Sequence, residues 1–235
     1  MRTRSFRRYA VAALSVAALA AVSGCGSDMH PGQAAVVEGQ RISMSDADSF
    51  ADDFCELYRP VLKQQKAALA MSTVRALALD VLVRDELAHR YAEEQGWTPP
   101  ASYRDAVAAI DDQAEQFQIA ASDVDTFRRV REAEEYANFV YAKAGGEDLG
   151  GTGEVNDPQA ALGRGREIFT EYADKADVTL DPRFGTVSAE GQYFPSTAGL
   201  SVPVTTLARG GAVPADPQSG DTSYVDSLPA DQKCG

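Results

Sequence analysis

The sequence predicts a mostly α-helical domain closed by a pair of short β-strands, one at each end of the domain. Five segments between residues 43 and 173 place apolar side chains at the three-and-four spacing of amphipathic helices. β-Branched runs come before and after them, at Val36-Val37 and at Val178-Thr179-Leu180. Since backbone N–H and C=O groups need partners, the simplest arrangement pairs these two strands with each other. A basic and then apolar segment precedes this domain, and an irregular tail follows it.

The first 24 residues have the layout of a secretory signal. Four arginines precede an apolar run, residues 9–22, that is shorter than the roughly 20 residues a membrane-spanning helix needs. The stretch Val22-Ser23-Gly24-Cys25 resembles the lipobox of bacterial lipoproteins. That resemblance implies cleavage before Cys25, a diacylglycerol on its thiol and acylation of the new N-terminus, for example by palmitate. The expected location is the extracytoplasmic face of the cell membrane. The alternative is an ordinary secretory signal with a chance cysteine.

Composition divides the chain into a signal peptide (1–24), a short polar tether (25–33), a helical domain (34–200) and a flexible tail (201–235). After Leu200 the periodicity is lost and prolines stand among Gly, Ser, Asp and Thr. The formal net charge of −13 argues against nucleic acid as a partner and against adsorption to anionic lipid. The expected link to the membrane is therefore the covalent lipid on Cys25.

Two further cysteines, Cys55 and Cys234, form an even pair once Cys25 carries lipid. Disulfides persist in the oxidising compartment that the signal predicts. A bond between them would attach the tail to the first helix. The chain-entropy model predicts that such a bond stabilises the folded state by about 5 kcal/mol. The alternative is a buried, free Cys55 with a loose Cys234.

The first two helices have recognisable starts and stops. Ser43 or Ser45 begins a helix that runs to about Tyr58, and Pro60 ends or kinks it. Ser72–Gln95 is the strongest periodic segment and is expected to be the central core helix. Its expected inner face comprises Val74, Leu77, Ala78, Val81, Leu82, Ala88, Tyr91 and Ala92.

Three more helices follow. Ser122 begins the fourth helix, which Gly145-Gly146 is expected to end. Asp157-Pro158 is a good N-cap and first-turn pair for the fifth. The third helix begins at Ser102, and its inward residues are expected to be Tyr103, Val107, Ile110, Ala114 and Phe117.

Motifs for catalysis and for metal or cofactor binding are missing from the sequence. His89 has Asp85 four residues before it in the central helix, which is typical of a surface pair. The sequence has no zinc-binding spacing, no phosphate-binding glycine loop after a strand and no nucleophile elbow. We therefore expect no catalytic residues, no metal and no cofactor.

Three segments together resemble the N-terminal domain of the periplasmic chaperone SurA and the related foldase PrsA. They are Ala35–Ser43, Leu87–Gly96 and Asp177–Gly185, so the resemblance covers residues 34–185. The family's prolyl isomerase domain would be inserted where this chain has only residues 145–156. The resemblance thus implies a chaperone-like scaffold without prolyl isomerase activity.

The sequence supports two hypotheses about function. The first is a lipid-anchored chaperone-like protein outside the cytosol that binds unfolded or secreted polypeptides. The second is a cell-envelope adaptor or structural lipoprotein that binds one folded partner. Stripes of Leu, Val and Phe are more often core than binding groove, so a groove has to be found in the fold itself.

Overall fold

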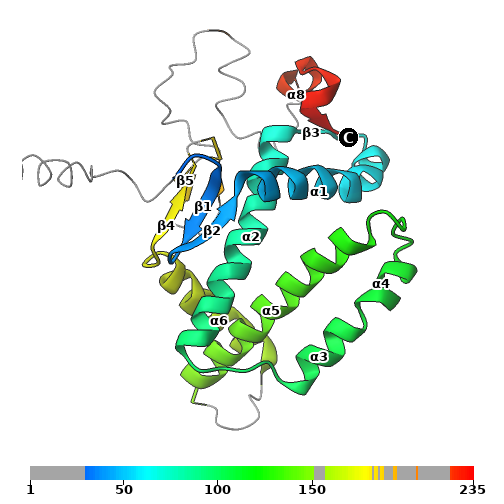
Figure 1. Cartoon of the computed structure of the whole chain (residues 1–235). Coiled ribbons are helices and arrows are strands. Elements are labelled where there is room, and N and C mark those ends of the chain that lie inside the picture. The colour runs from blue at the N-terminus through cyan, green and yellow to red at the C-terminus, as the bar shows by residue number, and fades with distance from the viewer. Residues whose placement is uncertain are drawn as a thin grey trace, which may run out of the picture.

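The computed structural model describes residues 30–150, 157–181, 183–184, 186–187, 193–194, 205 and 223–235. The signal peptide and Cys25 lie outside these residues. The described chain is mostly helical with a small antiparallel sheet at one side of the helices (Figure 1). The predicted fold class is therefore confirmed.

The sheet joins the two ends of the domain, as expected. Strand β1 (Gln33–Val37) lies between β2 (Gln40–Ser43) and β4 (Val178–Leu180), and both neighbours run antiparallel to it. In the β1–β4 pair, Val37 is opposite Val178. The third strand, β2, follows a two-residue turn in which Glu38 and Gly39 both have positive φ. Strand β1 is buried along its whole length, so the closure is part of the core.

Helix α1 (Met44–Gln65) begins as predicted, because the Ser43 hydroxyl accepts a hydrogen bond from the Asp46 N–H at 3.0 Å. It extends beyond the expected end near Tyr58 and contains Pro60. A proline leaves the carbonyl four residues earlier without its N–H partner. That carbonyl belongs to Glu56, an exposed residue, and the helix continues past the proline to Gln65.

Helix α2 (Met71–Glu94) is the central helix of the core. Its residues Leu79, Val83 and Leu87 pack with Val140 of helix α5 and with β1 in one buried cluster. A second cluster joins α2 to α1 around Phe50, Val74 and Leu82. Of the expected inner face only Leu77 is exposed, at 42 %.

An arm of two short helices replaces the single third helix that was expected. Helix α3 (Ala101–Ala108) and helix α4 (Ile110–Gln116) meet at Ala109 and run back beside α5 (Val124–Asp148) (Figure 1). Ile110 and Ala114 are buried as expected. Phe117 was expected to point inward and is 62 % exposed, because it follows the last turn of α4 at the end of the arm.

The expected end of the fourth helix at Gly145-Gly146 is wrong, since α5 continues to Asp148. Gly145 is instead a contact point with helix α6 (Pro158–Ala173), which begins at the predicted Asp157 cap. A Cβ on Gly145 would lie 1.9 Å from the Ala161 carbonyl oxygen. A Cβ on Gly165 of α6 would lie 1.8 Å from the Tyr141 carbonyl oxygen. The two helices therefore approach to backbone distance.

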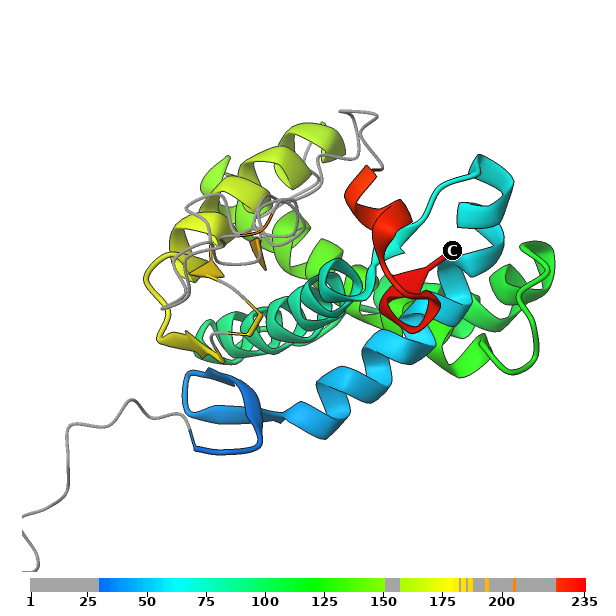
Figure 2. The same ribbon diagram turned by 90° about the horizontal axis from the view of Figure 1, so that it is seen from above.

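The end of the chain is folded onto the body, in contrast to the expected irregular tail. The described part contains helix α8 (Ser223–Ser227), a 3₁₀ turn η1 (Ala230–Gln232) and strand β7 (Lys233–Cys234). Strand β7 pairs with β3 (Leu69–Ala70), a two-residue strand between α1 and α2 (Figure 2). A separate two-stranded pair joins β5 (Thr186–Val187) to β6 (Tyr193–Phe194).

Candidate functional site

The structure brings together the second and third cysteines of the chain. The Cys55 and Cys234 sulfurs lie 2.11 Å apart across a sequence separation of 179 residues, and both side chains are buried. Strand β7 is thereby bound to α1, as the sequence hypothesis required. The candidate lipid anchor, Cys25, lies outside the described residues, so its role stays a prediction.

The histidine of the central helix is a surface residue. His89 Nε2 lies 3.5 Å from the Asp85 carboxylate, and its ring stacks on Tyr136 with centroids 3.7 Å apart. Within the described ranges, no three His, Cys, Asp or Glu side chains are grouped so that they could hold a metal ion. The histidine thus contributes to packing between α2 and α5.

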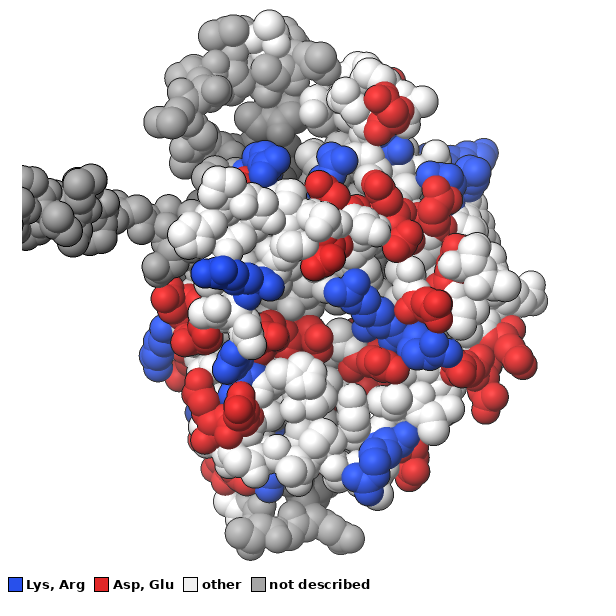
Figure 3. All heavy atoms as spheres, viewed as in Figure 1, with Lys and Arg blue, Asp and Glu red and all other residues white. Residues whose placement is uncertain are grey.

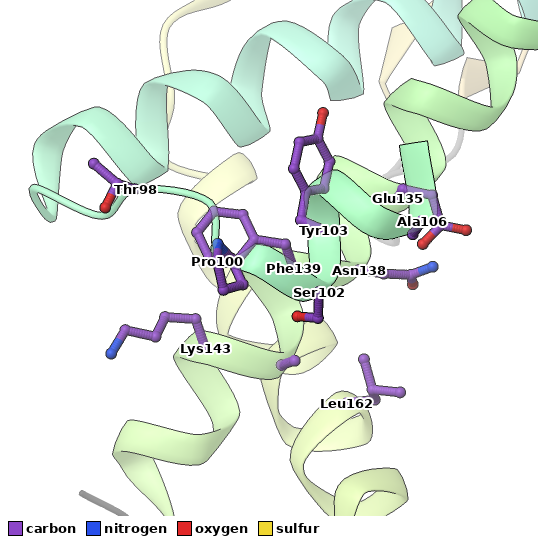
Figure 4. Close-up of a pocket in the computed structure, with 11 residues that line it drawn as sticks. Thr98, Pro100, Ser102, Tyr103, Ala106, Glu135, Asn138, Phe139, Lys143 and Leu162 are labelled. Atoms are coloured by element: carbon purple, nitrogen blue, oxygen red, sulfur yellow. The ribbon is translucent and has the colours of Figure 1, made fainter. Parts of the chain in front are cut away.

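A groove lies where the arm faces the body, between α3, the middle of α5 and the start of α6 (Figure 4). It is open to solvent and has a volume of about 610 Å³. The Pro99-Pro100 pair before α3 directs the chain away from α2 and begins this helix. No residue of α3 is fully buried, so the arm leaves the facing surface of α5 incompletely covered.

The floor of the groove is apolar. It is formed by side chains from the arm, from α5 and from the first turns of α6: Pro100, Tyr103, Ala106, Phe139, Ala142 and Leu162. Burial raises the pKa of the Tyr103 hydroxyl, and the Glu132 carboxylate raises it further, so this side chain is uncharged at neutral pH. In Figure 4 the hydroxyl points away from Ser102 and Leu162, and the groove receives the apolar part of the ring.

The two charged residues of the groove are engaged with neighbours on α5. Glu135 accepts a hydrogen bond from Arg131 at 2.7 Å, and Lys143 pairs with Glu147 at 2.7 Å. The Asn138 carboxamide and the Ser102 hydroxyl, in contrast, make no hydrogen bond with any other described residue. The groove therefore offers uncharged donors and acceptors above an apolar floor.

A second hollow of about 420 Å³ lies between α2, α5 and α6. Its wall carries charged side chains that pair with one another, since Arg84 Nε lies 2.9 Å from the Asp80 carboxylate. Burial raises the pKa of that carboxyl group, and Arg84 offsets only part of this effect. The hollow is thus less suited to an uncharged polypeptide segment than the groove.

The surface around these sites carries intermixed charges. Acidic and basic side chains alternate over the face shown in Figure 3, and many form pairs one helical turn apart, such as Arg90 with Glu86. In the part of the chain that the structure describes, none of the helices combines the length and the apolar composition needed to cross a bilayer.

The sequence indicated none of the groove residues as a site. Tyr103 was expected to face inward, and it does so only in part. Asn138 stands in the middle of α5 without any motif around it. The only available signal was a polar, hydrogen-bonding residue next to Phe139 on a helix otherwise rich in alanine and charges.

Comparisons of the chain with models of protein families, with curated proteins and with solved structures found no match.

Proposed function

We propose that this chain is a lipid-anchored, extracytoplasmic chaperone-like protein that binds unfolded or secreted polypeptides and has no prolyl isomerase activity. The observation that carries the proposal is the groove between α3 and α5, with its apolar floor and its uncharged polar groups. The motif ending in Cys25 supports the membrane attachment.

The chemistry of the groove suits an unfolded polypeptide. Such a chain offers apolar side chains together with peptide N–H and C=O groups. Pro100, Phe139 and Leu162 supply apolar contact area. The Asn138 carboxamide has both donors and an acceptor, so it matches one peptide unit without regard to the identity of the client residue. A groove whose charges are already paired does not select for charged clients.

The proposal is tested by the effect of the purified full chain on aggregation of citrate synthase during thermal unfolding. We expect suppression of light scattering at near-stoichiometric ratios. The matched variant is Ala142→Trp, which fills the groove from an exposed position of α5, and it should lose most of the effect. Absence of any suppression at a large molar excess of the wild-type chain would contradict chaperone-like binding.

Crosslinking in cells separates this proposal from the adaptor alternative. A photoreactive group at Ala106, on the wall of the groove, should capture many different secreted polypeptides. One dominant folded partner at that position would indicate an adaptor instead.

A prolyl isomerase assay with the full chain should read no activity above the uncatalysed rate.

A further inference from the structure

The two outer edges of the three-stranded sheet differ in what they expose. Strand order β2-β1-β4 leaves β2 and β4 at the edges (Figure 1). Edge strands present unpaired N–H and C=O groups, which form a template for another extended chain. The hydrogen bonds around β1 determine which residues of each edge strand face outward.

On β4 the outward residues are Val178 and Leu180. The Glu38 N–H donates to the Asp177 carbonyl at 2.8 Å, and the Asp181 N–H donates to the Ala34 carbonyl at 2.9 Å. Backbone groups of successive residues in a strand point to opposite edges. Positions 177, 179 and 181 therefore face β1, and positions 178 and 180 face away from it.

These outward groups have no backbone partner among the described residues. The side chains of Val178 and Leu180 are half-buried against the main core cluster, so the strand is fixed in place while its outer edge meets no other described strand. Valine, threonine and leucine at 178–180 include neither a charge nor a proline, which are two of the usual protections of an edge.

The β2 edge is protected in comparison. Gln40 faces β1, because it closes the two-residue turn opposite Val37. The backbone groups of Arg41 then face outward, and this residue carries a charged, exposed side chain. Two residues later Ser43 caps α1, so the strand ends there. The pairing of β1 with β2 is also irregular between Gln33 and Ala35, and such an irregularity disturbs a regular edge.

We propose that the free edge of β4 binds an extended segment of a client polypeptide as an additional antiparallel strand. The inference rests on the proposed function, in that the ligand is an unfolded polypeptide. It adds a second contact that recognises backbone through Val178 and Leu180, whereas the groove takes an apolar side chain. Main-chain recognition of this kind tolerates many client sequences.

The probe is a short fluorescein-labelled peptide of alternating valine and threonine, titrated with the full chain by fluorescence anisotropy. One version is N-methylated at every second residue and another at every residue. An added strand pairs along one edge only, so alternate methylation should leave affinity within about twofold. Methylation of every residue should weaken binding about tenfold or more, since it also removes the N–H groups on the edge that pairs with β4.

Variants of the protein give an independent measurement. Val178→Pro removes an outward N–H without removing any donor to β1. The affinity of this variant for the unmodified peptide should fall roughly fivefold or more. Val178→Thr retains the N–H and should bind like the wild type. The unfolding midpoint of each variant shows whether the fold is intact.

Equal binding of all three peptides to the wild type, or no binding of the unmodified peptide, would overturn strand addition. Neither result affects the citrate synthase measurement, which tests the groove. If aggregation is not suppressed but the methylation pattern is as expected, the edge binds extended peptides and the proposed chaperone-like function fails. The two proposals therefore fail in distinguishable ways.

Discussion

Helix α5 meets its neighbours on two faces in opposite ways. Toward α6, the glycines at positions 145 and 165 let the two backbones approach so closely that a single methyl group would overlap a carbonyl oxygen. Toward α3, the same helix leaves a groove of about 610 Å³ that is open to solvent. The closed face lacks side-chain volume at the crossing, whereas the open face has Phe139 and Tyr103 at its floor.

The two faces of α5 thus have different roles, since one packs against α6 and the other lines the groove. Where two helices meet through glycine, dispersion contacts involve the whole backbone and no ligand can enter. Where aromatic and small side chains face a short helix without buried residues, the surfaces do not interlock. Binding is then expected only on the second face, and changes in the two faces should affect different measurements.

The largest expected effect follows from closing the space at the glycine contact. Gly165→Ala would place a methyl group 1.8 Å from the Tyr141 carbonyl oxygen, and both atoms belong to rigid helices. The helices must separate, so we expect the free energy of unfolding to fall by about 4 kcal/mol. Chemical denaturation followed by circular dichroism measures this.

Gly163→Ala is the matched control, because it lies on the same helix. A methyl group at this position meets no atom within 4 Å, and alanine favours helix over glycine by about 1 kcal/mol. The control should therefore stabilise the protein slightly. Equal destabilisation by both changes would show that the close approach of α5 and α6 is not what holds them together.

The second effect concerns a region outside both the glycine contact and the groove. Replacing Cys55 and Cys234 together by alanine frees β7 from α1, and loss of a native disulfide typically costs about 3 kcal/mol. The groove lies among α3, α5 and α6, so citrate synthase protection at a temperature where the variant is folded should not change. Loss of protection in the folded variant would contradict the separation of stability from binding.

Much of the fold could be predicted because its signals are local. Ser43 and Asp157 cap helices through side chains that precede an apolar pattern, and the β-branched runs at positions 36 and 178 pair as expected. Strands β3 and β7 could not be predicted, since two residues carry no periodicity. Their pairing depends on contacts between residues far apart in the sequence.

Glycine and the groove show where local reasoning fails. Gly145 looked like a helix end, because the sequence alone does not tell a glycine needed for close approach from one needed for positive φ. The groove depends on how far α3 stands from α5, which is set by Pro99-Pro100 and by the break at Ala109. No pattern within either helix encodes that distance.

A third prediction tests the open face directly through stability. Ala142→Trp adds a large ring to α5 on the groove side, where Ala142 is exposed. We expect a change in the free energy of unfolding within about 0.5 kcal/mol. One methyl group on the closed face should thus cost far more than an indole on the open face. A loss comparable to that of Gly165→Ala would mean that the groove closes in solution.

The last expected effect is a difference in pH dependence between two carboxylates, Asp80 on α2 and Asp148 at the end of α5. Burial raises the pKa of Asp80, which faces Arg84. The exposed Asp148 accepts hydrogen bonds from Arg164, which lower its pKa. A raised pKa means that the native state holds the proton more tightly than the unfolded state, so that contribution to stability is lost as pH rises through the folded pKa. A lowered pKa has the opposite sign.

Unfolding curves between neutral pH and pH 4 for Asp80→Asn and Asp148→Asn measure these contributions. As pH falls, the wild type should gain stability relative to Asp80→Asn, by less than about 1 kcal/mol, and should lose stability relative to Asp148→Asn. Asparagine keeps an oxygen that can accept a hydrogen bond from the same arginine. Any pH-independent change in the free energy of unfolding can therefore be separated from the change in its slope with pH. Slopes of the same sign would show that Asp80 is as well hydrated as Asp148, and that water enters between α2 and α5 beside the glycine contact.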